Sequence, residues 1–146
     1  MTADRVQPSR GLLDTNILIL WGRIERSELP TQMAISAVTL AELSAGVHSL
    51  PKDVTESVRA ERIDLLQRAE SGFDPIPFDV AAARAYGRIS ATVLAFGRSP
   101  RSRVADLMIA SIAASRALPL YTTNPSDFAG LEKLVTVIPV PRPTDA

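Results

Sequence analysis

Residues 11–20 read GLLDTNILIL and place one carboxylate, Asp14, between two apolar runs. The run before Asp14 predicts a short buried β-strand, and the run after it predicts a short helix that packs on the sheet. An unpaired charge is expensive to bury, so a buried acid is normally neutralised, paired with a cation or bound to a metal ion. An Asp-Thr-Asn sequence after a strand also fits a simple Asx-turn. The rest of the chain must decide between these explanations.

Composition limits the class of protein. The chain has 146 residues, 46% of them hydrophobic and 22% charged, which is typical of one globular domain. Sixteen basic and sixteen acidic residues balance, so no overall field points to nucleic acid or membrane, and any such binding must be local. The absence of cysteine excludes disulfides, thiolate metal sites and cysteine nucleophiles. With no apolar signal core or membrane-length apolar run, we expect a cytoplasmic protein.

Short apolar runs alternate with longer helical patterns, which predicts an α/β fold with a mainly parallel sheet. We expect strands at residues 10–14, 33–38, 118–122 and 134–138, with a short edge strand within 75–78. We expect helices at residues 17–21, from about 39 to 48, at 53–71, from 79 to about 97, and at 104–117. The charges of the 53–71 helix are typical of a solvated outer face. The expected organisation is a flexible N-terminal segment at 1–9, a domain at 10–138 and a C-terminal tail at 139–146.

Acidic residues stand at the ends of the expected strands. Asp14 closes the first strand, Glu42 lies in the first turns after the second, and Asp106 lies in the first turn of the most apolar helix. Asn124 and Asp127 follow the penultimate strand. Because the carboxyl ends of parallel strands line a common crevice, these groups are expected to converge.

Converging carboxylates repel one another, and a divalent cation relieves that repulsion. Oxygen ligands, with no cysteine and a single histidine, point to Mg²⁺ or Mn²⁺. Each acid taken alone also fits a helix cap or a partner of a helix dipole. His48 fits a helix-end residue, and no serine or lysine has a recognisable nucleophile context.

Four motifs occur in order along the chain: LLDTN, TLAEL, VADLMIASIAA and LYTTNPSDF. Together they resemble the PIN domain, and specifically the VapC toxins of toxin–antitoxin pairs, over about residues 10–138. The resemblance implies a three-layer α/β/α domain and a metal-dependent endoribonuclease. Asp14, Glu42 and Asp106 match the three acidic positions of the family. At the fourth acidic position this chain has Asn124, with Asp127 three residues further on.

The resemblance also implies roles for these residues. Asp14 and Asp106 would bind the principal Mg²⁺ or Mn²⁺ ion, and Glu42 would bind a second ion or orient water. Asn124 or Asp127 would complete the site, or the site would work with three acids. An arginine-rich loop directly before Asp106 suits phosphate oxygens and is a candidate RNA-binding surface, although a solvated polar loop fits as well. Its candidate RNA-binding residues are Arg98, Arg101 and Arg103.

VapC-like proteins commonly form homodimers and are inhibited by an antitoxin peptide that reaches the acidic cleft. We therefore expect an RNA substrate, a C2 homodimer and a VapB-like antitoxin that blocks the carboxylates with a basic side chain. Apolar content beyond one sheet face is consistent with a dimer interface, although burial within the monomer explains it as well. The alternative is a catalytically silent PIN-like nucleic-acid-binding or regulatory module. An aspartyl phosphatase fits less well, because Asp14 is followed by Thr15 and Asn16 rather than by a second aspartate.

Overall fold

The computed structural model describes residues 10–144. The expected segment at residues 1–9 and the last two residues of the expected tail lie outside this range. The strands are β1 (Arg10–Leu13), β2 (Gln32–Ala34), β3 (Leu120–Thr122) and β4 (Val137–Pro139). The α-helices are α1 (Thr15–Ile19), α2 (Ala37–His48), α3 (Glu56–Gly72), α4 (Val80–Ala95) and α5 (Val104–Ser115). Short 3-10 helices are η1 (Trp21–Arg23), η2 (Arg26–Glu28), η3 (Pro100–Arg103) and η4 (Pro125–Phe128).

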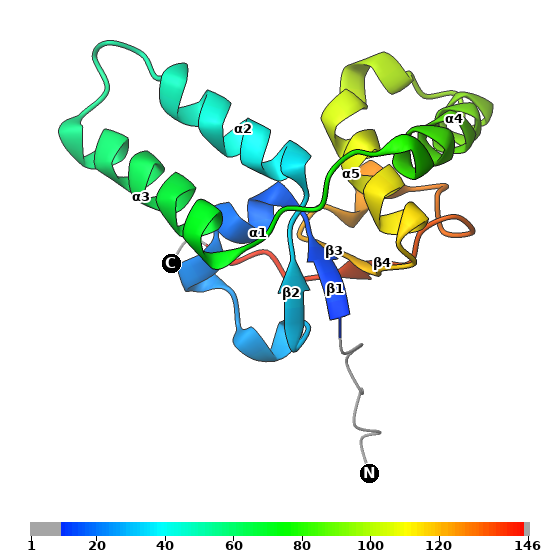
Figure 1. Ribbon diagram of the computed structural model, residues 1–146, viewed down its shortest axis with the longest axis horizontal. Helices are drawn as coiled ribbons and strands as arrows, with labels where there is room; N and C mark the ends of the chain where they lie inside the picture. The colour runs from blue at the N-terminus through cyan, green and yellow to red at the C-terminus, as the bar shows by residue number, and fades with distance from the viewer. Residues whose placement is uncertain (1–9, 145–146) are drawn as a thin grey trace.

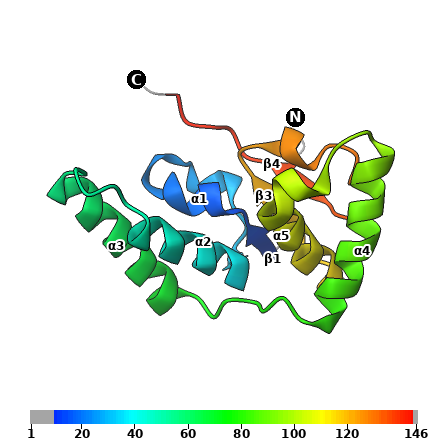
Figure 2. The same cartoon turned by 90° about the horizontal axis from the view of Figure 1, so that it is seen from above.

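The four strands form one sheet in the order β2-β1-β3-β4, and every neighbouring pair is parallel. The helices α1, α2 and α3 lie on one side of the sheet, and α4 and α5 lie on the other (Figures 1 and 2). This arrangement is the expected three-layer α/β/α fold. Because all strands run in the same direction, the carboxyl ends of the central strands β1 and β3 lie at the same edge of the sheet.

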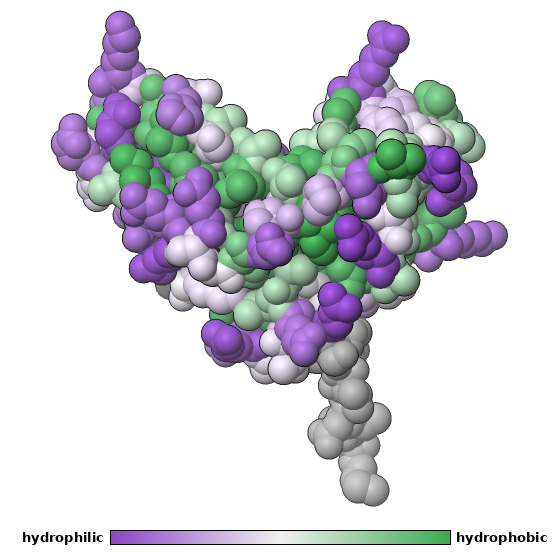
Figure 3. All heavy atoms as spheres, viewed as in Figure 1, coloured by the Kyte–Doolittle hydropathy of each residue, from purple (hydrophilic) through white to green (hydrophobic). Residues whose placement is uncertain are grey.

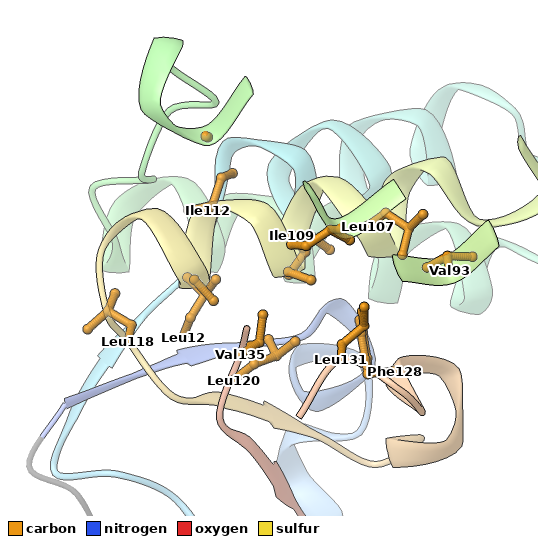
Figure 4. Packing of buried hydrophobic residues seen from close by; sticks show 14 residues of the cluster. Leu12, Val93, Leu107, Ile109, Ile112, Leu118, Leu120, Phe128, Leu131 and Val135 are labelled. Carbon is orange, nitrogen blue, oxygen red and sulfur yellow. The ribbon is translucent and has the colours of Figure 1, made fainter. Parts of the chain in front are cut away.

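Neighbouring residues of the central strands point to opposite faces of the sheet. Leu12 and Leu120 pack with α4 and α5, as Figure 4 shows for the labelled side chains, whereas Leu13 and Tyr121 pack with α1, α2 and α3. All four side chains are fully buried. Covering both faces of the sheet explains why these strands read as continuous apolar runs rather than alternating ones.

Side-chain caps fix where several helices begin. Ser36 caps α2 by accepting a hydrogen bond from the Thr39 backbone N–H, so the helix begins at Ala37, two residues earlier than expected. Asp79 caps α4 as expected, accepting from the Ala82 N–H. Thr55 caps α3, which therefore begins three residues later than expected.

Several strands are shorter than expected. β2 ends at Ala34 rather than at residue 38, because Ser36 already caps α2, and β3 begins at Leu120 rather than at residue 118. The edge strand expected within 75–78 is reduced to one parallel bridge between Ser36 and Ile76, flanked by two prolines that cannot donate to a ladder. The last strand begins at Val137 because the chain turns before it, where the Val135 N–H donates to the Leu131 carbonyl. Beyond β4, Val140 is buried against the α1–α3 side.

Polar and apolar residues are mixed on the outer surface, and the α2–α3 side and the α4–α5 side stand apart as two projections (Figure 3). Within residues 10–144 no helix has the length and apolar character needed to cross a bilayer.

Candidate active site

A cavity of about 190 Å³ opens beside the carboxyl end of β1 and brings together three acids that are far apart in the sequence. Asp14 follows β1, Glu42 comes from α2, and Asp106 comes from the first turn of α5. The remaining lining residues are Thr15, Asn16, Ile19, Leu43, Gly46, Arg62 and Leu65. The topology therefore places carboxylates from three elements on one concave surface.

Asp14 is buried, with 4% of its surface exposed. One carboxylate oxygen accepts a hydrogen bond from the Thr15 backbone N–H at 2.9 Å, and the other accepts from the Thr122 hydroxyl at 2.8 Å. Burial raises the pKa of Asp14, the two hydrogen bonds oppose that rise, and the charges of Glu42 and Asp127 add to it. No basic side chain within residues 10–144 forms an ion pair with Asp14. The hydrogen bonds hold the carboxylate in place, but they leave its charge unbalanced.

Asp106 is partly buried and lies close enough to Asp14 to interact with it electrostatically. Burial is the main cause that raises the pKa of Asp106 to about 6, and the charges of Asp14, Asp127 and Glu42 contribute. Arg103 acts in the opposite direction. The position of Asp106 at the amino end of α5 also favours a negative charge through the helix dipole.

Glu42 is exposed, yet its carboxylate is not free to rotate. Its Oε1 accepts a hydrogen bond from the Thr15 hydroxyl at 2.7 Å. Thr15 therefore contacts two of the three acids, donating its backbone N–H to Asp14 and its hydroxyl to Glu42.

The two candidates for a fourth ligand lie outside the cavity lining. Asp127 accepts a hydrogen bond from Arg103 Nη1 at 3.0 Å, and its charge reaches Asp14 and Asp106. Asn124 has its side-chain oxygen 3.4 Å from Arg142 Nη1 and donates its backbone N–H to the Thr122 hydroxyl. In this structure each candidate is held by an arginine.

The cavity fits a hard divalent cation in its chemistry. Its charged oxygen donors are carboxylates, and a cation would relieve both the burial of charge and the repulsion that together raise the pKa of Asp106. As placed, no group of three or more acidic or histidine side chains within residues 10–144 could hold an ion. Mg²⁺ commonly uses only one or two carboxylates and completes its shell with water and substrate phosphates. The residues therefore fit an ion held by few direct protein ligands.

Two of the three loop arginines are used within the fold. Arg98 donates to the Ser126 carbonyl at 3.0 Å, and Arg103 donates to both the carbonyl and the carboxylate of Asp127. These bonds attach the loop to η4. Arg101 is exposed and forms no hydrogen bond or ion pair with any residue in the described part of the chain.

Sequence reasoning missed several residues around the site. Arg62 lines the cavity from α3, although the charges of this helix were interpreted as a solvated face. Thr122 and Thr15 hold Asp14, and polar residues at strand ends were a usable signal for both. No pattern in the sequence singles out Arg62 from its charged neighbours.

The fold and the cavity have counterparts among known proteins. Residues 11–134 match the family described as the PIN domain, and the chain belongs to that family. It is 38% identical to Ribonuclease VapC5 of Mycobacterium tuberculosis over 133 residues, which cover 89% of this chain and 93% of that protein.

Solved structures agree with this assignment. The crystal structure of VapBC-5 from Mycobacterium tuberculosis matches with a TM-score of 0.75 and 37% identity, covering 89% of this chain and 96% of the matched one. FitAcB from Neisseria gonorrhoeae matches with a TM-score of 0.63 and 26% identity, covering 87% and 95%. The expected resemblance to PIN domains of the VapC type is confirmed.

The raised pKa of Asp106 predicts how pH affects the stability of the metal-free protein. Because the folded-state pKa of Asp106 lies above the ordinary value for an aspartate, Asp106 contributes stability at low pH that is lost as pH rises through about 6. Asp106→Asn removes this loss. Urea unfolding measures the free energy of unfolding of both proteins at each pH. Between about pH 4 and pH 8, the free energy of unfolding of Asp106→Asn should rise relative to that of the wild type by on the order of 1–2 kcal/mol, after allowance for solvent screening.

The exposed residue Asp53 provides the control, since it lies in the turn before α3, away from the cavity. Asp53→Asn should differ from the wild type by the same amount at every pH. A pH-independent difference for Asp106→Asn would contradict the account of its electrostatics.

Proposed function

We propose that the protein is a metal-dependent endoribonuclease that acts as the toxin of a toxin–antitoxin pair. The observation that carries the proposal is the convergence of Asp14, Glu42 and Asp106 on one cavity at the carboxyl end of β1. The similarity to Ribonuclease VapC5 over most of both chains supports the same reaction class. We place this activity in the cytoplasm, because an RNA substrate and a chain without cysteine both suit that compartment.

Each carboxylate has a proposed role. When bound, Mg²⁺ or Mn²⁺ supplies an activated water and neutralises charge on the phosphodiester. Asp14 and Asp106 would hold the principal ion, because they are the two acids of the cavity whose pKa values are raised, chiefly by burial. Glu42, held by the Thr15 hydroxyl at the cavity wall, orients water or holds a second ion.

A fourth ligand would have to come from η4 or the residue before it. Asp127 can join the site by exchanging Arg103 for an ion, and Asn124 by exchanging Arg142. Asp127 is better placed, because its charge already acts on both Asp14 and Asp106.

The proposed partners are an antitoxin of the VapB type and a second copy of the chain. A groove with apolar and charged walls adjoins the cavity at the shared residues Ile19 and Leu65, and it becomes mainly apolar further along, at Trp21 and Phe73. An antitoxin segment lying there can place a basic side chain among the carboxylates. Most apolar side chains of α5 are buried within the chain and are not available to a partner. A dimer interface would therefore use apolar side chains that are exposed, such as Leu94.

The proposed RNA contacts involve Arg62 as well as the arginine loop. Arg62 is the one basic residue in the described chain that lines the acidic cavity. Arg101 is the loop arginine whose guanidinium is available to a phosphate, whereas Arg98 and Arg103 already hold η4. Because Arg62 and Glu42 line the same cavity, Arg62 would bind an RNA phosphate that enters it.

Removing the charge of Asp14 or Asp106 should abolish cleavage without unfolding the protein. We expect Asp106→Asn and Asp14→Asn to cut RNA at less than about 1% of the wild-type rate, because each loses a charged ligand. Cleavage of a labelled RNA with Mn²⁺ measures the loss, and circular dichroism measures the fold. Asp53→Asn should retain full activity.

The same assay separates the proposal from its alternative. RNA binding without cleavage by the wild type, at any Mg²⁺ or Mn²⁺ concentration, would support a catalytically silent nucleic-acid-binding module. Wild-type activity in Asp106→Asn would remove the metal-site argument.

Each phosphate-contacting arginine should contribute to the salt dependence of RNA binding. In an Asp106→Asn background, Arg62→Ala and Arg101→Ala should each reduce the slope of log affinity against log salt by about 0.7. Arg88→Ala on α4, whose residues do not line the cavity, is the control and should leave the slope unchanged. An unchanged slope in Arg62→Ala would exclude Arg62 from the RNA contact.

A further inference from the structure

Three hydroxyl groups form a chain that ends at Glu42. The Ser36 hydroxyl lies 3.4 Å from that of Thr39, and the Thr39 hydroxyl lies 3.0 Å from that of Thr15. The Thr15 hydroxyl lies 2.7 Å from Glu42 Oε1. Ser36 and Thr39 are fully buried, and the chain runs from the start of α2 across to the start of α1.

The direction of every hydrogen bond in this chain is determined by Glu42. An ionised carboxylate only accepts, so the single proton of the Thr15 hydroxyl must point at Glu42. The Thr39 hydroxyl must then donate to Thr15, and the Ser36 hydroxyl donates to Thr39. The Thr39 backbone N–H completes the arrangement by donating to Ser36.

Thr39 thereby stabilises the one rotamer of Thr15 that serves the site. Thr15 also donates its backbone N–H to Asp14, so the residue links the exposed acid Glu42 to the buried acid Asp14. Without an acceptor, an exposed glutamate side chain retains much of its rotamer freedom, and ordering it costs entropy. A donor that is already oriented lowers that cost, and hydrogen bonds in series polarise one another.

We propose that Thr39 is a positioning residue for Glu42 and acts through the Thr15 hydroxyl. Thr39 does not line the cavity, and this chain of hydrogen bonds connects it to Glu42. The consequence for catalysis rests on the proposed ribonuclease function, whereas the ordering of Glu42 does not.

A purely structural role for Thr39 in the first turn of α2 is the competing explanation. Substitution by valine keeps the shape and removes the hydroxyl, and substitution by serine keeps the hydroxyl. Thr123→Val is the matched control, because the Thr123 hydroxyl is buried and has no partner in the described part of the chain. Removing an unpartnered hydroxyl should be nearly neutral.

The first experiment uses the metal-free protein. Three-bond NMR couplings of the Glu42 side chain should report one dominant rotamer in the wild type, in Thr39→Ser and in Thr123→Val, and averaged rotamers in Thr39→Val. Unaveraged couplings in Thr39→Val would overturn the proposal. If Thr39→Val fails to fold, NMR of the wild type can still test the proposal through the Thr39 hydroxyl proton. A slowly exchanging Thr39 hydroxyl proton that lies close to Thr15 would support the proposal. A Thr39 hydroxyl proton directed away from Thr15 would refute it.

The second experiment measures RNA cleavage. Thr39→Val should lower kcat by about three- to tenfold, the worth of one hydrogen bond, with little change in KM. Thr39→Ser should restore kcat to within about twofold. In a Glu42→Gln background Thr39→Val should cause no additional loss, whereas a structural role would persist there. Failure of the wild type to cleave RNA would defeat the proposed function and leave the NMR result to decide the role of Thr39.

Discussion

The burial of the Asp14 carboxylate at the end of β1 is the constraint on which the site depends. Its two oxygens are held by the Thr15 N–H and the Thr122 hydroxyl, so β1, α1 and β3 meet at one charged group. Hydrogen bonds fix its position but do not cancel its charge, and burial raises its pKa. A cation can balance this carboxylate, which explains why an otherwise apolar segment contains an aspartate.

The neighbouring groups can be ordered by how they respond to that charge. Burial, with repulsion by Asp14 added to it, raises the pKa of Asp106 to about 6, whereas Asp127 is paired with Arg103 at the edge of the site. Glu42 is exposed and is positioned by hydroxyl groups rather than by burial. The cavity therefore combines one buried and fixed acid, one acid with a raised pKa and one acid held by a hydroxyl group.

Much of this arrangement could be predicted from the sequence, because its signals are local. Apolar runs marked the two central strands, and the position of Asp14, Glu42 and Asp106 after strands or at helix starts placed them at one edge of the sheet. Side-chain partners across the sheet could not be predicted in this way. The attachment of Arg103 to Asp127 and the contribution of Arg62 depend on how loops and α3 pack, and periodicity carries no information about either.

The central claim is that a divalent cation neutralises the charge around Asp14, and Mn²⁺ binding tests it most directly. Isothermal titration at about pH 6, in two buffers that differ in ionisation enthalpy, measures affinity and proton release together. We expect Mn²⁺ to bind the wild type and to displace protons, because Asp106 is partly protonated at that pH. We expect Asp106→Asn to bind Mn²⁺ more weakly and to release fewer protons. Equal affinity and equal proton release in the two proteins, or no Mn²⁺ binding by the wild type, would contradict it.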